Sequence, residues 1–206
     1  MALKKALNQP SKKPTMLQSF YNATAIEAGL DEVGRGCLAG PVVAAAVILP
    51  KDYAHPWLND SKQLTKSQRL VLEIEIKNHA LAWAIGEVSA RQIEEINILK
   101  ASFLAMHHAV DQLGVRPEHL LVDGNRFVPY PLVPHTCIVK GDTKFLAIAA
   151  ASILAKTYRD QLMENLAADF PHYDWARNAG YPTAAHRRGI VAFGTCVHHR
   201  MTFKLL

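Results

Sequence analysis

The stretch AGLDEVGRGCLAGPVVAAAVIL, residues 28–49, decides the fold of this chain. Residues 26–33 and 42–49 are short and apolar, and glycines and a proline lie between them, which predicts two strands joined by a tight loop. The second segment is apolar on both faces, as is typical of a strand inside a sheet that is covered on both sides. We therefore expect a sheet with residues 42–49 in its interior.

The rest of the chain alternates between strand-like and helix-like segments. Ser89 and Gln92 have the spacing of a capping box, which predicts that a helix begins there. The predicted strands are residues 26–33, 42–49, 81–88, 119–123 and 136–140, and the predicted helices are residues 64–79, 89–113 and 143–168. This alternation predicts an α/β domain in which helices cover a mixed sheet of five strands.

Composition excludes several classes of protein. The chain has 206 residues, of which 50% are hydrophobic and 20% charged, as is typical of one globular domain. Cys37, Cys137 and Cys196 are too far apart in sequence for a zinc motif and are odd in number, which indicates a reducing compartment, the cytoplasm. No apolar run approaches 18 residues and the N-terminus lacks a signal peptide, so we expect neither a membrane protein nor a secreted one.

The charges are distributed unevenly along the chain. The net charge is +5, yet residues 1–19 and 175–206 contain nine basic residues and no acidic one, so the remainder carries a net charge of −4. Basic ends favour a polyanionic partner such as nucleic acid. The C-terminal arginines are the favoured contact, because groups that can stack or form hydrogen bonds lie among them. These groups are Tyr181, His186, His198 and His199.

Four acidic residues lie where predicted strands end. Asp31 and Glu32 close the first strand, Asp123 closes the fourth, and Asp142 follows the fifth. Carboxylates that converge at the ends of neighbouring strands repel one another unless divalent cations neutralise them. Oxygen ligands without cysteine or paired histidine favour Mg²⁺ or Mn²⁺ over zinc. Adjacent residues of a regular strand face opposite sides, so Asp31 and Glu32 share a site only where the strand ends or bulges.

A glycine-rich loop follows the first pair of acids. Gly34, Arg35 and Gly36 come directly after a strand, as in a dinucleotide-binding loop. Pro41 and another strand follow, however, where that motif requires the N-terminus of a helix. The exposed backbone of such a loop could instead approach a sugar or a phosphate closely.

These residues resemble the bacterial ribonuclease HII family. The matching segments are AGLDEVGRGCLAGPVVAAAVIL (28–49), NDSKQLT (59–65), LLVDGN (120–125), VKGDTKFLAIAAASILAKTYRD (139–160) and AGYPTAAH (179–186). The resemblance implies an RNase H-like fold, with a mixed five-stranded sheet flanked by helices and a helical C-terminal part. It also implies an endonuclease that cuts the RNA strand of RNA–DNA hybrids. Such an enzyme nicks duplex DNA 5′ of an embedded ribonucleotide, leaving 3′-hydroxyl and 5′-phosphate ends.

The resemblance also implies roles for individual residues. Asp31, Glu32, Asp123 and Asp142 match the acidic quartet that holds Mg²⁺ or Mn²⁺, with two ions engaged during catalysis. The remaining matches concern the substrate. Gly34, Arg35 and Gly36 match the loop that grips the 2′-hydroxyl, Ser61 and Lys62 match a phosphate-contacting segment, and Tyr181 matches the tyrosine that packs on the following deoxyribose.

The sequence departs from the family pattern in places. Cys37 replaces a common proline, and Cys196 interrupts a G-x-T-x-x-H-R stretch. We expect residues 1–22 to form a basic flexible arm and residues 23–206 to form the catalytic domain, including the basic C-terminal segment, in a monomer. The arm is too short for the N-terminal domain of ribonuclease HIII, which argues against that sister family.

A sliding clamp is a further candidate partner. Leu17, Phe20 and Tyr21 have the spacing of short clamp-docking peptides, although Pro14 stands where these usually carry glutamine. Two alternatives to ribonuclease HII also stay open. One is a nucleic-acid-binding protein without activity, which the intact acids disfavour. The other is a nuclease of the same superfold without ribonucleotide selectivity, which the glycine loop and Tyr181 disfavour.

Overall fold

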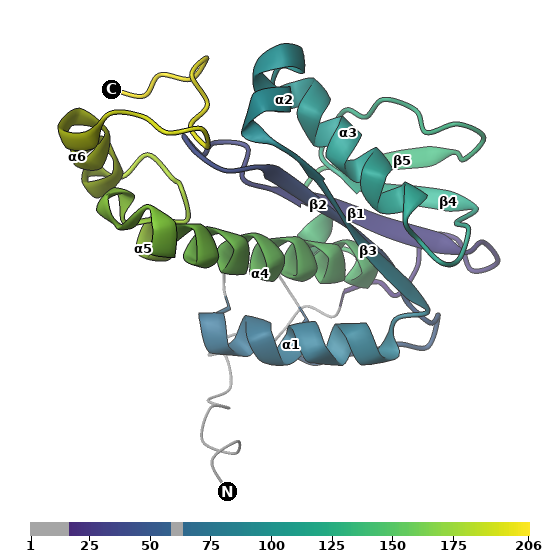
Figure 1. The fold of residues 1–206 in the computed structure, drawn as a ribbon. Coiled ribbons are helices and arrows are strands. Elements are labelled where there is room, and N and C mark those ends of the chain that lie inside the picture. Colours follow the sequence, from purple (N-terminus) through teal and green to yellow (C-terminus); the bar gives the residue numbers. More distant parts are fainter. Residues whose placement is uncertain (1–16, 59–63) are drawn as a thin grey trace, which may run out of the picture. The chain divides into compact units, whose positions relative to one another are not determined.

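The computed structural model describes residues 17–58 and 64–206 (Figure 1). The strands of its sheet are β1 Glu27–Val33, β2 Val42–Ile48, β3 Ala82–Val88, β4 His119–Asp123 and β5 His135–Ile138. The α-helices are α1 Lys66–His79, α2 Ala90–Ile96, α3 Ile98–Asp111, α4 Leu146–Asp169, α5 Trp175–Asn178 and α6 Ala184–Phe193. Two 3₁₀ turns, η3 Gly141–Thr143 and η4 Pro171–Tyr173, complete the described elements. None of the described helices is both long and apolar enough to cross a membrane.

The five strands form one mixed sheet in the order β3-β2-β1-β4-β5, which confirms the α/β prediction. Strand β1 pairs in parallel with β4, and β4 pairs in parallel with β5. Every residue of β2 is buried, as the two-sided apolar pattern of 42–49 predicts for an interior strand. Parallel neighbours end at the same edge of a sheet, so β1, β4 and β5 bring their C-terminal residues together.

Local sequence signals explain where the first three helices begin. Ser89 caps α2 through the predicted capping box with Gln92, and Thr65 caps α1 in the same way with Gln68. The predicted helix 89–113 is two helices, because Asn97 has a φ of 67° and interrupts it. The Asn97 side chain then accepts hydrogen bonds from the first amides of α3, so it acts as the N-cap of the second helix.

Contacts divide the described chain into two compact units. The first unit comprises residues 17–31, 46–83 and 113–154, without 59–63, and the second comprises residues 32–45, 84–112 and 155–206. A buried cluster of the first unit consists of Leu121, Ile138, Phe145 and Ile148. A buried cluster of the second consists of Leu38, Ala39, Met163, Tyr173, Trp175 and Ile190. The three cysteines are free thiols, in agreement with the sequence.

Candidate functional site

Three of the four predicted acids, Asp31, Asp123 and Asp142, belong to the first unit. The β1–β4 ladder runs from Glu27 opposite His119 to Leu30 opposite Val122, and Asp31 and Asp123 follow these last paired residues directly. Asp31 is only 7% exposed. The register therefore sets two carboxylates on neighbouring parallel strands at the same edge of the sheet.

Asp142 reaches this edge through a tight turn after β5. It lies in η3, which contacts β4, and is 4% exposed. The amide of Gly141 donates a hydrogen bond of 2.7 Å to Asp123 Oδ1 and so joins the turn to the end of β4. A Cβ at Gly141 would lie 2.5 Å from Ile148 Cδ1, so a larger residue there would require the Ile148 side chain to move.

The chemistry of these donors fits Mg²⁺ or Mn²⁺. Buried carboxylates offer hard oxygen ligands, and burying them without a compensating charge is costly. As the side chains stand, no three His, Cys, Asp or Glu residues in the described part of the chain form a ready metal-binding group. The backbone thus brings the acids to one edge, and side-chain rotation would have to complete a metal site.

Glu32 and the glycine loop belong to the second unit. Strand β1 continues through Glu32 to Val33. The Glu32 carboxylate accepts a hydrogen bond of 2.9 Å from Arg35 Nη1, and its side chain is 11% exposed. The loop arginine therefore orients this acid, while Gly34, with φ of 92°, makes the turn that a side chain would strain.

Two fully buried arginines hold the glycine loop. Arg159 on α4 donates to the carbonyls of Pro41, Ala39 and Ala179 at 2.9, 2.9 and 2.7 Å. Arg200 donates to the carbonyls of Gly40 and Arg35 at 2.8 to 3.0 Å. Burial lowers the pKa of Arg200 to about 10, so it stays charged at neutral pH. These hydrogen bonds from buried side chains hold the backbone of the loop in place.

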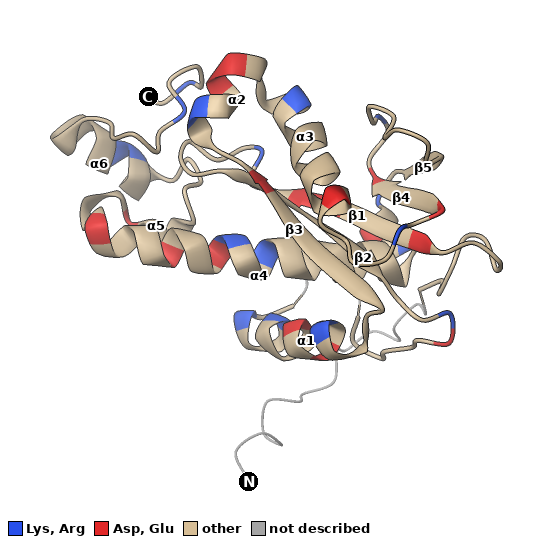
Figure 2. Ribbon diagram, turned by 45° about the vertical axis from the view of Figure 1, so that its right-hand side comes forward, with Lys and Arg blue, Asp and Glu red and all other residues tan. Residues whose placement is uncertain are grey.

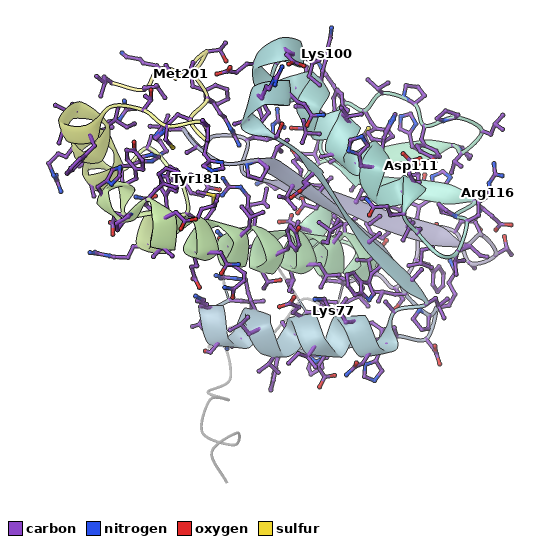
Figure 3. All side chains as sticks on the ribbon, in the orientation of Figure 1. Lys77, Lys100, Asp111, Arg116, Tyr181 and Met201 are labelled. Carbon is purple, nitrogen blue, oxygen red and sulfur yellow. The ribbon has the colours of Figure 1, made fainter. Side chains whose placement is uncertain are left out.

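Tyr181 lies on the segment that joins α5 and α6 (Figure 3). Its amide donates to Asn178 O at 2.9 Å, the residue is 38% exposed, and Lys156 Nζ lies 5.7 Å from the ring centroid. Burial, together with the Cys37 thiol, raises the pKa of Tyr181. Cys37 is itself buried, with its Sγ 3.6 Å from Ala179 O. The second unit thus brings Tyr181 and the glycine loop together.

A chain of imidazoles supports the Tyr181 backbone. Trp175 Nε1 donates to His186 Nε2 at 2.9 Å, so His186 carries its proton on Nδ1 and donates it to Tyr181 O at 3.0 Å. His199 Nδ1 accepts from the Cys196 amide at 3.0 Å, so its own proton lies on Nε2, 3.1 Å from His186 Nε2. Burial lowers the pKa of both histidines, that of His199 to about 4.

The structure corrects the prediction for the C-terminal basic block. Basic residues do lie on α6 and on the C-terminal segment (Figure 2). Arg200, His186 and His199, however, are at most 3% exposed and bind the protein's own groups, so they are not free to contact a partner. Sequence analysis also assigned no role to Arg159. It stands among polar and charged residues, from Lys156 to Gln161, so its burial has no signal in the local sequence. The predicted Ser61 and Lys62 lie outside the described residues.

The candidate clamp-docking residues lie against the first unit. The amides of Tyr21 and Asn22 donate to the Glu27 carboxylate, and the Tyr21 ring stacks on His119 at a centroid distance of 5.9 Å. Gln18 forms a parallel bridge with Phe145. Leu17 is half-buried, whereas Phe20 and Tyr21 are 39% and 56% exposed.

Comparisons with known proteins agree with one another. The profile of the family described as Ribonuclease HII matches residues 28–206. Ribonuclease HII of Bacteroides thetaiotaomicron is 63% identical, over 93% of this chain and 96% of that protein. The RNase HII of Archaeoglobus fulgidus, solved in a complex with PCNA, has a TM-score of 0.68 and 27% identity, covering 88% of this chain and 96% of that one. Bst-RNase HIII, solved in complex with Mn²⁺, has a TM-score of 0.65 and 20% identity, covering 96% and 71%.

Proposed function

The chain belongs to the ribonuclease HII family and is thus a ribonuclease H, a metal-dependent endonuclease that acts on RNA–DNA hybrids. From this premise, we propose that it also nicks duplex DNA 5′ of single embedded ribonucleotides, with two divalent ions, leaving 3′-hydroxyl and 5′-phosphate ends. The observation that carries the proposal is the placement of Asp31 and Asp123 just beyond the last paired residues of two parallel strands.

The acids would hold the metal ions at the edge of the sheet. Asp31, Asp123 and Asp142 supply carboxylates from β1, β4 and η3, and Glu32 is adjacent in the chain. Bound Mg²⁺ or Mn²⁺ supplies charge neutralisation at the phosphate and lowers the pKa of a coordinated water. Phosphoryl transfer depends mainly on positioning and electrostatics, which accounts for a site without a side-chain nucleophile.

The second unit would recognise the ribonucleotide. Backbone groups of Gly34, Arg35 and Gly36 are suited to contact the 2′-hydroxyl, which alone distinguishes a ribonucleotide from its DNA neighbours. Within residues 17–58 and 64–206, and apart from the chain neighbours of Gly36, no heavy atom lies within 4 Å of a Cβ built at Gly36, which leaves room for a ligand there. The ring of Tyr181 would pack on the following deoxyribose, and its raised pKa keeps the phenol protonated.

The test is cleavage of a labelled DNA duplex that contains one ribonucleotide. The wild type is incubated with Mg²⁺, Mn²⁺ or EDTA, alongside an all-DNA duplex and a continuous RNA–DNA hybrid. Asp123→Asn keeps an oxygen that can accept from Gly141 and removes a charge. We expect it to lose at least about 100-fold in kcat, because it weakens the charge stabilisation of the transition state. Asp111→Asn at the end of α3 is the matched control.

The outcomes separate the alternatives. A metal-dependent nick 5′ of the ribonucleotide that Asp123→Asn loses and Asp111→Asn keeps supports the proposal. Comparable cutting of all-DNA duplex would instead indicate a nuclease without ribonucleotide selectivity. Cutting of the hybrid alone would refute the proposed action on single ribonucleotides.

A sliding clamp is a second proposed partner. The Archaeoglobus fulgidus relative was solved with PCNA, and in this chain the exposed parts of Phe20 and Tyr21 are available for docking. Lys51 Nζ lies 5.2 Å from the centroid of the Phe20 ring, in a cation–π contact. Tyr21, in contrast, is held by a hydrogen bond from its amide to Glu27 and by stacking of its ring on His119. Phe20→Ala should therefore reduce retention on an immobilised clamp without changing nicking, and Val128→Ala is an exposed apolar control in the same unit. Equal retention of the wild type, Phe20→Ala and Val128→Ala would refute docking of the clamp on Phe20.

A further inference from the structure

Arg159 is a buried cation whose side chain joins two separate pieces of the proposed recognition surface. It is 0% exposed, and its three nitrogen atoms each donate to a different carbonyl oxygen. The acceptors Ala39 and Pro41 lie at the end of the glycine loop, while Ala179 lies two residues before Tyr181. One guanidinium therefore fixes the distance between the loop and the tyrosine segment.

Two glycines of the loop leave the space that this side chain occupies. A Cβ on Gly34 would lie 2.2 Å from Arg159 Nε, and a Cβ on Gly40 would lie 3.2 Å from Arg159 Nη2. Both glycines have positive φ, of 92° and 82°. Loop and arginine thus fit one another, so displacing the guanidinium would release a backbone conformation that it now holds in place.

Further contacts tie the same two segments together. The Leu38 amide donates to Gly180 O at 2.8 Å, and Cys37 Sγ lies 3.6 Å from Ala179 O, the carbonyl that also accepts from Arg159. Ala179 has a left-handed backbone, with φ of 47°. A residue in this strained conformation persists only where surrounding contacts hold it. Arg159 provides such a contact to Ala179 O, and a charged donor forms a stronger hydrogen bond than a neutral one.

We infer that Arg159 is a positioning residue for ribonucleotide selectivity, which sets the glycine loop and Tyr181 at the spacing of a ribonucleotide followed by a deoxyribonucleotide. This inference rests on the proposed function. The planar guanidinium donates in three fixed directions at once, which a lysine ammonium on a flexible stem cannot reproduce. Arg159 would act through these two segments, to which its three hydrogen bonds are made.

The test compares two substrates of the same enzyme preparation. The selectivity ratio is kcat/KM on a duplex with one ribonucleotide divided by kcat/KM on a continuous RNA–DNA hybrid. This ratio is independent of the active fraction, so partial misfolding leaves it unchanged. Arg159→Lys should lower it about tenfold, equivalent to about 1.4 kcal/mol. Arg177→Lys, on an 85% exposed side chain of α5, is the control and should keep the wild-type ratio.

A double mutant shows whether Arg159 acts through Tyr181. Tyr181→Ala should itself lower the ratio, and adding Arg159→Lys should lower it further by much less than tenfold, because the group it positions is already gone. The dependence of hybrid cleavage on Mn²⁺ concentration should stay the same in all variants. Should Arg159→Lys fail to fold, Cys37→Ala decides, since it removes the other side-chain contact to Ala179 O and should lower the ratio about threefold.

The outcomes distinguish this inference from the proposed function. A lowered ratio in Arg159→Lys with little further effect in the double mutant supports it. Equal losses on both substrates would mean that Arg159 only stabilises the fold, and would overturn the inference while leaving the proposed function intact. An unchanged ratio in folded Arg159→Lys or, where that variant does not fold, in Cys37→Ala would overturn it as well. A wild type that does not nick the single-ribonucleotide duplex would refute both.

Discussion

His199 makes the stability of the second unit depend on pH in a way that one substitution can isolate. Its Nδ1 accepts from the Cys196 amide and its Nε2–H points at His186 Nε2, so an added proton would face a donor and break the network. Burial and the neighbouring His186 lower the pKa of His199 from 6.5 to about 4. The folded protein therefore excludes a proton that the unfolded chain binds readily.

The sign and the size of the effect follow from this difference in pKa. Between pH 6.5 and pH 4 the unfolded chain binds the proton and the folded protein does not, so the free energy of unfolding falls as the pH falls. The slope approaches about 1.4 kcal/mol per pH unit in this window. His199 alone should thus cost about 2 kcal/mol between pH 7 and pH 5, and below pH 4 the loss is complete.

Urea denaturation at pH 7 and pH 5, followed by tryptophan fluorescence, measures this loss. EDTA is present throughout, so that metal binding does not contribute to the pH dependence. His199→Gln keeps an acceptor and a donor without titrating. Whatever its stability at pH 7, the difference in its free energy of unfolding between pH 7 and pH 5 should be smaller than that of the wild type by about 2 kcal/mol. Comparing the two proteins cancels the contribution of titratable groups that do not contact residue 199. The same loss between pH 7 and pH 5 in His199→Gln would refute the reasoning.

Three further predictions concern packing, backbone strain and thiol burial. Gly29→Ala would place a Cβ 2.2 Å from the Ala147 carbonyl carbon, so we expect the free energy of unfolding in urea to fall by at least about 3 kcal/mol. At the control position Gly114, a Cβ would have no neighbour within 4 Å among the described residues, so Gly114→Ala should change it little. Asn97 has φ of 67° and ψ of 161°, a region that favours glycine, so Asn97→Gly should be about as stable as the wild type, while Asn97→Ala should lose about 2 kcal/mol. Burial raises the pKa of Cys37, which is 0% exposed, so native alkylation followed by mass spectrometry should label Cys137 and Cys196 well before Cys37, and early labelling of Cys37 would contradict its burial.

The strands of the sheet could be predicted from the sequence, because the apolar pattern of a strand lies within a few consecutive residues. The two-sided apolar run 42–49 marks an interior strand by itself, and β2 is buried at every position. The break at Asn97 was not predicted, because the apolar pattern continues across it and only the backbone dihedral angle reveals it. The placement of Asp123 at the end of β4 and of Asp142 after β5 was likewise predictable, whereas Asp31 lies inside β1, which continues to Val33. The geometry of a metal site was not predictable, since it depends on side-chain conformations that no sequence pattern encodes.

The buried cations and imidazoles were the least predictable part of the candidate site. Arg200, His186 and His199 lie in a segment with five basic residues and no acid, which reads as an exposed nucleic-acid contact. Their partners are backbone carbonyls and other rings, distant in sequence, as when Arg200 binds Gly40 O. Every residue carries a backbone carbonyl, so the sequence does not show which carbonyl accepts a hydrogen bond from a buried guanidinium. Buried basic residues near a recognition surface can therefore hold in place the backbone that contacts the ligand. Their burial, which only the folded structure reveals, distinguishes this role from direct contact with nucleic acid.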